Sequence, residues 1–345
     1  MSFFKNIQLL SILLLLASYL HAQKKEVQIN AVAFYNLENL FDTIDDPKKF
    51  DEDFTPQGSY HYTSEIYHKK LHNMATVISQ LAIEKIPDGP AFIGVSEIEN
   101  ETVLQDLIHQ PELEKRKLRI VHFESPDSRG IDVAMLYNPK YFKVINAKAL
   151  PVEIMENGKR EYTRDVLYVT GKLGDDTFHV FVNHWPSRRG GEAATVWKRA
   201  KAASVSKGMI DSIMAVNPNA KAIVMGDLND DPTDPSVLKT LGAVAKISQI
   251  KPGGLYNPWI DFYKKGIGTL GYNDSWDLFD QIIVSYGFVK PDANNWRFYK
   301  AEIFNDTFLK NAFGKYKGYP HRSFSGTTWI DGYSDHFPTI IYLTK

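Results

Sequence analysis

Short apolar runs rich in β-branched and aromatic residues recur along the chain from residue 27 to its end. They read VQINAVAFYNL, AFIGVSEI, IDVAMLYN, VLYVTGKL, FHVFVNHW, KAIVMGDL, FDQIIVS and TIIYL. Several are bounded by Gly, Pro, Asn or Asp, which is the pattern of strands that end in turns. Both helix-like segments and short connections separate the runs, so we expect mixed β-sheets.

Two segments between these runs have helical periodicity, with apolar residues three and four positions apart. They cover residues 64–84 and residues 192–214, and a further helix is expected after the phrase EIEN. No internal repeat, low-complexity block or Ser/Gly-rich linker divides the chain. We therefore expect one catalytic domain of α/β (α+β) class over residues 23–345 rather than two, with long loops at 231–275 and 292–333.

The first 22 residues have the layout of a secretory signal peptide. Lys5 precedes the apolar run ILLLLASYL, and Ala22 and the polar residues QKKE follow it. The run from Ile7 to Leu20 is shorter than the roughly 20 apolar residues of a membrane span. We expect cleavage after Ala22, export to the periplasm or the extracellular space, and a mature chain without a membrane span.

Composition narrows the classes of protein that remain. The chain has no cysteine, which excludes disulfides, thiolate chemistry and cysteine-ligated zinc. Its formal net charge of -1 argues against nucleic-acid binding by bulk electrostatics alone, so an anionic substrate needs a local site. Nothing in the sequence indicates an obligate protein partner.

Six of the apolar runs end in acidic, amide and histidine residues. These are Asn36 and Glu38, Glu97, Asn183 and His184, Asp227 and Asn229, Asp280, and Asp335 and His336. Each alone has an ordinary explanation as a turn residue, a helix cap or a core histidine. Because ligands gather where strands end and loops converge, we expect the six ends to meet in one site.

The stretch VMGDLNDDP allows two kinds of cation site. A calcium hand that starts at Asp227 needs glycine at position 232 and an acid at position 238, but the chain has Pro232 and Leu238 there. Magnesium needs only one or two carboxylates besides substrate oxygens and water, and Glu97 is the best candidate ligand. We therefore expect Asp230 and Asp231 to be turn residues ahead of Pro232.

The phrases FYNLENLFD, SEIEN, VNHWPS, GDLN and SDHFP, in this order, resemble the endonuclease/exonuclease/phosphatase superfamily. These metal-dependent phosphoesterases share the fold of deoxyribonuclease I, and the similarity is nearest to a secreted bacterial branch. The resemblance covers nearly all of the mature chain. It implies a four-layer sandwich, in which two mixed, mostly antiparallel β-sheets pack face to face with helices outside. It also implies a divalent cofactor, Mg²⁺ or Mn²⁺, with Ca²⁺ as a further alternative.

The resemblance assigns an expected role to each matching residue. Glu97 would be the main metal ligand, and Asp335 would lie beside the metal. The catalytic residues would be His184, Asp227, Asn229, Asp280 and His336, with Asp280 paired to His336. Asn36, Arg164 and Ser187 would contact the phosphate, although Arg164 alone could be a surface arginine. In SRGIDVAMLYN, Asp132 could pair with His184 or could simply end a turn.

Phosphoester hydrolysis needs an in-line water, a positioned base and cationic stabilisation of the phosphoryl oxygens. Asp227 is a candidate base. A carboxylate such as Asp280 would favour the charged form of His336, which could then act as an acid or as a phosphate clamp. The sequence leaves open which group moves which proton.

We expect a nuclease that acts on DNA or RNA. Arg188 and Arg189 precede a double glycine and could hold flanking phosphates on a basic, flexible rim. Five aromatic residues could stack on bases or pack within their own loops: Trp185, Tyr256, Trp259, Tyr272 and Trp276. The alternatives are a phosphatase or phosphodiesterase for a small molecule or lipid head group, and a binding protein that has lost catalysis.

Overall fold

Two large β-sheets form the centre of the protein in the computed structural model, which describes residues 27–290 and 294–345. The expected signal peptide lies outside the described residues. The first sheet has the order β16 (Arg297–Ile303), β19 (Thr339–Thr344), β1 (Ile29–Leu40), β2 (Phe92–Ile98), β4 (Asp132–Tyr137), β3 (Arg119–His122). The second has the order β11 (Ala243–Val244), β12 (Leu255–Tyr256), β15 (Asp280–Ser285), β10 (Lys221–Asp227), β9 (Asp176–His184), β8 (Val166–Leu173), β5 (Phe142–Leu150).

Both sheets are mixed and mostly antiparallel. The parallel pairs are β1 with β2 in the first sheet, and β9 with β10 and β11 with β12 in the second. Ile29 pairs with Thr344, so the start of β1 and the end of β19 lie side by side. The polar end of β1, which carries Asn36, lies at the opposite end of that pairing.

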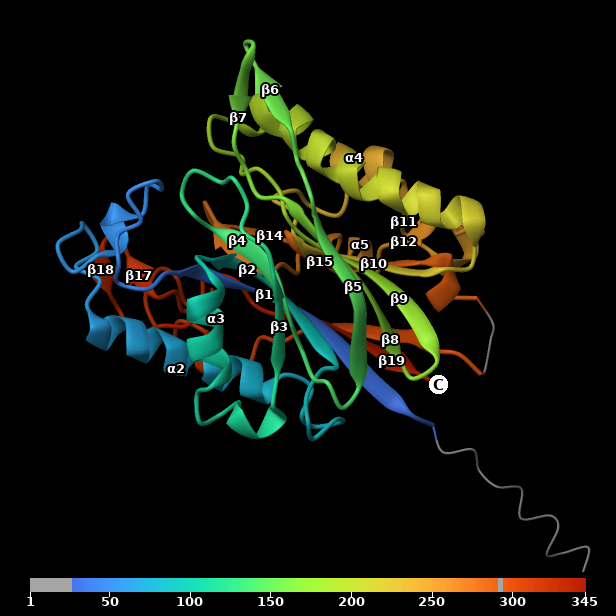
Figure 1. The fold of residues 1–345 in the computed structure, drawn as a ribbon, viewed down its shortest axis with the longest axis horizontal. Coiled ribbons are helices and arrows are strands. Elements are labelled where there is room, and N and C mark those ends of the chain that lie inside the picture. The colour runs from blue at the N-terminus through green and yellow to red at the C-terminus, as the bar shows by residue number, and fades with distance from the viewer. Residues whose placement is uncertain (1–26, 291–293) are drawn as a thin grey trace, which may run out of the picture.

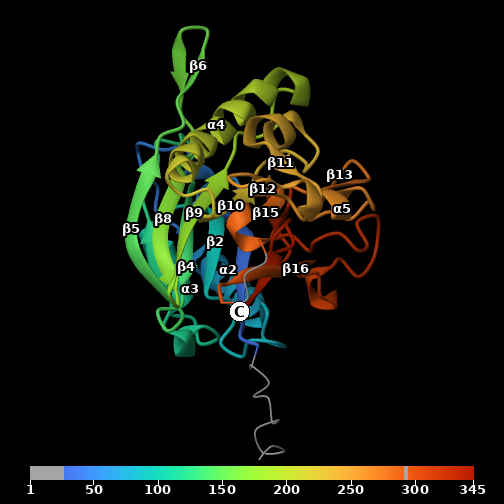
Figure 2. The ribbon, with the colours of Figure 1, turned by 90° about the vertical axis from the view of Figure 1, so that its right-hand side faces the viewer.

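The sheets pack face to face, with helices on their outer faces (Figures 1 and 2). The inner faces approach closely: a Cβ atom added to Gly94 of β2 would lie 2.5 Å from Met225 Sδ of β10. The helices α2 (Ser64–Gln80) and α3 (Glu101–Ile108) cover the first sheet, and α4 (Glu192–Val216) covers the second. The expected four-layer arrangement is confirmed.

All eight apolar runs form strands, and the expected helices correspond to α2, α3 and α4. The two segments expected as long loops are partly structured. The first holds a π-helical turn at Ser236–Leu241, the short helix α5 (Ile260–Tyr263) and the hairpin of β13 (Leu270–Tyr272) and β14 (Ser275–Asp277). The second holds β16 and the hairpin of β17 (Phe324–Ser325) and β18 (Thr328–Trp329).

A third hairpin, β6 (Ile154–Glu156) and β7 (Lys159–Glu161), projects away from the layers (Figure 1). Among the described residues, no helix is long and apolar enough to cross a membrane.

Candidate active site

Three of the predicted residues form one row across the end of the second sheet. Asp227, the last residue of β10, is directly opposite His184 of β9 and Asp280 of β15 in the strand register. Neighbouring strands lie about 4.8 Å apart, so the register alone brings the three side chains together. The glycine before Asp227 is required by this close approach, because a Cβ on Gly226 would lie 2.1 Å from the carbonyl oxygen of Asn183.

The first sheet contributes Asn36 from β1 and Glu97 from β2. The pairing of β2 with both neighbours shifts between Ser96 and Ile98, which marks a β-bulge at Glu97. Glu97 has a φ of 58°, a conformation that a residue with a side chain adopts only when its surroundings hold it there. Bulges turn a side chain away from the regular pleat, and here Glu97 is directed to the same end of the sandwich as Asp227.

Contacts join six side chains into one catalytic cluster: Asn36, Glu97, His184, Asp227, Asp280 and His336. One oxygen of Asp227 is at its centre. Asn36 Nδ2 donates to Asp227 Oδ2 at 3.0 Å. The Nε2 atoms of His184 and His336 lie 3.7 Å and 3.9 Å from the same oxygen. The other oxygen, Oδ1, accepts the backbone N–H of Asn229 at 3.0 Å. Burial, opposed by His336, raises the pKa of Asp227 to about 7, so this carboxyl can exchange a proton near neutral pH.

The two histidines have opposite electrostatic surroundings. Burial alone would lower the pKa of His336, but Asp280, whose Oδ2 is 2.7 Å from Nδ1, holds that pKa well above its usual value. Burial, together with the charges of Arg164 and Arg129, lowers the pKa of His184 well below its usual value. At neutral pH His336 is therefore a cation and His184 is neutral.

The residues around His184 have the donor chemistry of a divalent-cation site. Glu97, His184 and Asp227 each place a ligand atom within 4.8 Å of the others. Nδ1 of His184 is buried and finds no hydrogen-bond partner among residues 27–290 and 294–345, and Nε2 faces Glu97 Oε1 at 3.7 Å. Carboxylate oxygens suit Mg²⁺ and Mn²⁺, and a neutral imidazole is a further donor for Mn²⁺. The residues present therefore fit a divalent cation.

Asp335 lies next to this group but is not one of its three members. Its Oδ2 pairs with Arg322, and its Oδ1 is 3.9 Å from His336 Nε2. Arg322 also approaches Glu38 Oε1 at 3.6 Å. The carboxylates of Asp335 and Glu38 are therefore both paired with Arg322, a residue that the sequence did not single out.

The remaining predicted residues differ in their exposure. Arg164 is buried, and its guanidinium donates to the carbonyls of His184 and Trp185 and to Asp127. These bonds use three of its five N–H groups and leave two. The side chain of Asn229 donates to the carbonyl of Trp185 at 2.9 Å. Ser187 is exposed on the loop that follows β9.

A buried polar group beside the site was missed in the sequence. Lys70 of α2 is fully buried, and its Nζ donates to the Glu38 carbonyl and to Ser323 Oγ. The Glu38 carboxylate accepts the backbone N–H of Ser323 at 2.7 Å, and burial raises its pKa to about 7. The signal was available, because Lys70 is four residues from both Ile66 and Met74 and so stands on the apolar face of α2.

Asp230 and Asp231 are more than turn residues, which corrects the expectation. Asp230 is buried and pairs with the fully buried Arg199 of α4 and with Ser236. Asp231 accepts the backbone N–H of Leu278 at 2.8 Å. Arg188 contacts Asp231 as well, so it is not the free arginine expected on the rim.

The structure decides between alternatives that the sequence left open at two places. Asp132 does not pair with His184; its Oδ2 lies 2.9 Å from His122 Nε2, and its Oδ1 accepts the Ser125 N–H at 2.9 Å. Trp185 and Trp259 are buried in the core and cannot stack on a base. Of the five aromatic residues named, Tyr272 is the exposed one, at 66%.

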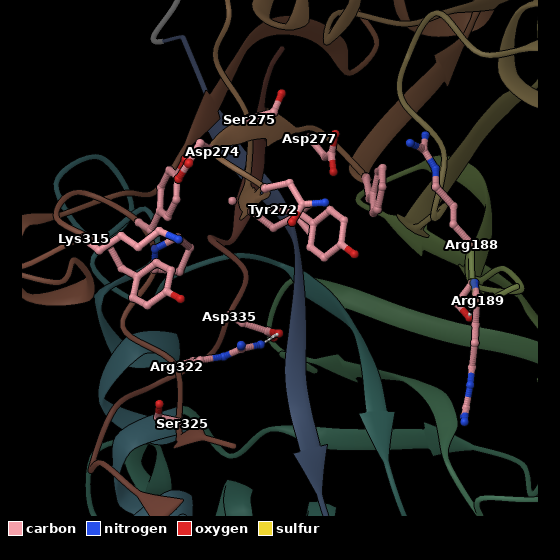
Figure 3. A pocket seen from close by; sticks show the side chains of 18 of the residues that line it. Arg188, Arg189, Tyr272, Asp274, Ser275, Asp277, Lys315, Arg322, Ser325 and Asp335 are labelled. Carbon is pink, nitrogen blue, oxygen red and sulfur yellow. Dashed lines mark hydrogen bonds and ion pairs between the residues drawn. The ribbon is translucent and has the colours of Figure 1, made fainter. Parts of the chain in front are cut away.

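A large open cavity borders the cluster, and its lining includes Asp335 and Ser187. Its volume is about 1110 Å³. Figure 3 shows the Arg322–Asp335 pair below Tyr272 near the middle of the view, with Lys315 on the left and Arg188 and Arg189 on the right. The site is therefore open to a substrate larger than a phosphate ion.

Comparisons with known proteins agree with this architecture. No curated protein sequence matches the chain significantly. The structure of D. rerio TDP2 complexed with single strand DNA product is 13% identical and has a TM-score of 0.54, with 92% of this chain and 100% of that chain covered. Truncated Caenorhabditis elegans TDP2 is 15% identical, with a TM-score of 0.53 and 92% and 98% covered. The Bacteroides thetaiotaomicron mannosyl-6-phosphatase Bt3783 is 14% identical, with a TM-score of 0.53 and 91% and 99% covered.

At these identities the solved structures establish the fold alone. The sequence model of the Endonuclease/Exonuclease/phosphatase family matches residues 31–345, which includes every residue of the cluster. The chain therefore belongs to the endonuclease/exonuclease/phosphatase family of phosphoester hydrolases.

Proposed function

We propose that the protein is an exported, divalent-metal-dependent phosphodiesterase that hydrolyses DNA or RNA. The observation that carries the catalytic part is the arrangement around Asp227 Oδ2, where a protonated and a neutral histidine face one carboxylate beside Glu97. Export rests on the signal-peptide pattern of residues 1–22, and N-terminal sequencing of the protein from cell fractions would test it.

Glu97 and His184 would hold the cation, with Asp227 and Asp335 as further carboxylates near it. A Mg²⁺ or Mn²⁺ ion bound there would supply positive charge to the phosphoryl oxygens and the leaving oxygen. Ca²⁺ is a third possibility. Glu97 is held for this role by the backbone N–H of Asn39, which donates to Oε2 at 3.0 Å and leaves Oε1 facing His184.

The side chains supply the proton chemistry. Asp227 is the proposed base that accepts a proton from the attacking water, and Asn36 and the Asn229 N–H fix the orientation of its carboxylate. His336 is held protonated by Asp280 and offers Nε2–H to a phosphoryl oxygen. The free N–H groups of Arg164 and the hydroxyl of Ser187 are the proposed further phosphate contacts.

The large cavity supports a nucleic-acid substrate. Tyr272 and Tyr316 line it and are 66% and 58% exposed, and aromatic faces of this kind stack on unpaired bases. The TDP2 structure that holds a single-strand DNA product has the same fold, which makes the comparison relevant to this substrate class.

A phosphoester of a small molecule, such as a sugar phosphate, is the second candidate. The charges that line the large cavity cancel, because four cationic side chains face four acidic ones. A neutral cavity suits hydroxyl groups as well as bases, and a mannosyl-6-phosphatase is among the structures with this fold.

The test is a substrate panel with purified protein and Mg²⁺ or Mn²⁺. Plasmid DNA, single-stranded DNA, RNA, bis(p-nitrophenyl) phosphate and a hexose phosphate are assayed with and without EDTA. Cleavage of a nucleic acid that EDTA abolishes supports the proposal, and activity on the hexose phosphate alone supports the second candidate. If EDTA-sensitive activity is absent on all five, the catalytic proposal is wrong.

Replacement of His336 by alanine tests the assigned centre. The variant should lose at least about 100-fold in kcat, since a positioned acid or base contributes that much or more. His109→Ala is the matched control, because His109 is exposed at the end of α3 and its ring contacts the carbonyl of Gln105, away from the cluster. An active, folded His336→Ala variant would refute the assignment.

A further inference from the structure

A second, smaller cavity adjoins the catalytic cluster. Its volume is about 280 Å³, and it shares Ser187 and Arg189 with the large cavity. Its other wall is the loop that carries Asp127 and Arg129, together with Arg164. From the sequence, Arg164 and Ser187 are expected to contact the phosphate and Arg189 to hold a flanking phosphate, and all three line this cavity; Arg129 carries no such expectation.

The catalytic cluster is linked by contacts to both cavities. Arg164 lines the small cavity, and its Nε donates to the carbonyl of His184 at 3.2 Å. From His184 the contacts continue through Asp227 and His336 to Asp335, which lines the large cavity. A strand bound at the cluster can therefore extend into the small cavity, which adjoins the cluster at Arg164, and into the large cavity, which adjoins it at Asp335.

The two cavities differ in charge. Arg129, Arg164, Arg189 and Lys198 line the small cavity with two acidic residues, Asp127 and Glu161, which gives a formal charge of +2. The large cavity is formally neutral and contains the exposed tyrosines. The small cavity is therefore the side that favours an anion, and the large one favours a base or sugar.

Two of the four cations in the small cavity are available. Lys198 is bound to Glu156 and Glu161, and Arg164 to Asp127 and backbone carbonyls. Within the part of the chain that the structure describes, the Arg129 guanidinium has one ion pair, a long one from Nε to Asp127 Oδ1 at 3.8 Å, and its side chain is 44% exposed. Arg189 is exposed, and the described residues offer its guanidinium no ion pair. An incoming phosphate would thus find two arginines without close carboxylate partners.

The loop that carries Arg129 is held in place before any ligand binds. Lys49 Nζ donates to the carbonyls of Ser125 and Asp127 at 3.1 Å and 3.0 Å. Asp127 in turn accepts the Arg129 N–H at 2.9 Å and pairs with Arg164 at 3.0 Å. A fixed loop lowers the entropy cost of ligand binding.

We propose that Arg129 and Arg189 form a second phosphate subsite, which binds the phosphate next to the scissile one in a nucleic-acid strand. This inference rests on the proposed nuclease function. It implies that the enzyme engages the strand on both sides of the reacting phosphate and cuts internal bonds. It also replaces Arg188, which Asp231 and Asp234 occupy, as the holder of the flanking phosphate.

The test has a kinetic arm and a binding arm. Arg129→Gln and Arg189→Gln are compared with Arg119→Gln, an exposed arginine on β3 that lines neither cavity. The kinetic arm measures kcat/KM for a single-stranded oligothymidylate and for bis(p-nitrophenyl) phosphate, which has no flanking phosphate. The binding arm titrates inorganic pyrophosphate into metal-free protein by calorimetry.

For each cavity variant, the ratio of kcat/KM for the oligonucleotide to that for the small diester should fall about tenfold, the value of one charge-assisted hydrogen bond. Its dependence on salt concentration should also become weaker. The pyrophosphate dissociation constant should rise about tenfold, since the same contact is lost. Arg119→Gln should change none of these.

Each outcome separates the two proposals. If the wild-type protein cleaves the oligonucleotide and the ratio is unchanged in both variants, the subsite is refuted and the nuclease function stands. If the wild-type protein cleaves only the small diester, the nuclease function fails. In that case, variants that bind pyrophosphate as tightly as the wild-type protein refute the subsite too. A tenfold weaker affinity in the variants would support an anion site at Arg129 and Arg189.

Discussion

At the scale of single residues, the pair of Asp280 and His336 makes the sharpest prediction. Asp280→Asn removes the negative charge that holds the pKa of His336 above its usual value, and burial then acts to lower it. A reaction that needs protonated His336 would therefore fail at a lower pH than in the wild-type enzyme. We expect kcat to fall about 100-fold with a smaller change in KM, and the alkaline limb of the pH profile to move to lower pH.

The control for this prediction is Thr269→Val. Thr269 donates its hydroxyl to the same oxygen of Asp280, at 2.5 Å, but carries no charge. Its replacement should leave the alkaline limb in place. If Asp280→Asn also leaves the limb in place, the group that titrates in the enzyme is not His336.

Site residues could be predicted from the sequence where they lie at the end of a strand. His184, Asp227 and Asp280 were found because each ends or begins an apolar run, and the register then aligns them. The side chain with which each site residue pairs could not be predicted, because it depends on the conformation of the loops. Asp132 has His122 at 2.9 Å across the β3–β4 pair, and whether its partner is His122 or His184 depends on how the loop between the strands turns.

At the scale of elements, the turn after β10 is bonded both to α4 and to the segment before β15. Asp230 binds Arg199 of α4, and Asp231 binds the backbone before β15. Because these carboxylates are buried and paired, the turn also carries a pH-dependent part of the stability. Burial raises the pKa of Asp231 from 3.8 to about 6.

The sign of this contribution follows from where the proton is bound. Between pH 3.8 and about 6 the folded state keeps the Asp231 proton that the unfolded state releases, so stability falls as pH rises through this window. The full difference is about 3 kcal/mol at most. In Asp231→Asn this part of the pH dependence should be absent, as measured by urea unfolding across the window. An unchanged slope would show that Asp231 titrates normally.

Elements were predictable where their burial pattern was strong. The eight apolar runs are strands, but β16 was expected to lie in a loop because an edge strand is buried on one side and its sequence, RFYKAEI, mixes charged and apolar residues. The bulge at Glu97 could not be predicted at all. It depends on pairing with both β1 and β4, which no local stretch of sequence contains.

At the scale of the whole molecule, the packing of the two sheets sets the distance between the metal ligand and the proposed base. Glu97 ends a strand that contains Gly94, and Asp227 ends a strand that contains Met225. A Cβ at Gly94 would lie 2.5 Å from Met225 Sδ and 3.1 Å from Val182 Cγ1. The sheets approach this closely because residue 94 is glycine. Since β2 and β10 continue from this contact to Glu97 and Asp227, the distance between the sheets here also affects the distance between those two side chains.

Gly94→Ala should therefore weaken both stability and catalysis. Overpacking of this kind costs about 1–3 kcal/mol, and the shift of β2 against β10 should lower kcat/KM in the same variant. Met225→Ala makes room for the added methyl, so the double variant should be less destabilised than the sum of the single variants by about 1 kcal/mol or more. Thermal or urea unfolding of the four proteins measures this coupling.

Gly208→Ala is the control, because Gly208 lies inside α4 and an added Cβ there meets no atom within 4 Å. Alanine is the better helix former by roughly 1 kcal/mol, so this variant should be more stable and equally active. Additive effects of Gly94→Ala and Met225→Ala would mean that the two strands do not contact each other at this point. If Gly94→Ala is destabilised but fully active, the contact between β2 and β10 contributes to stability but does not set the positions of Glu97 and Asp227.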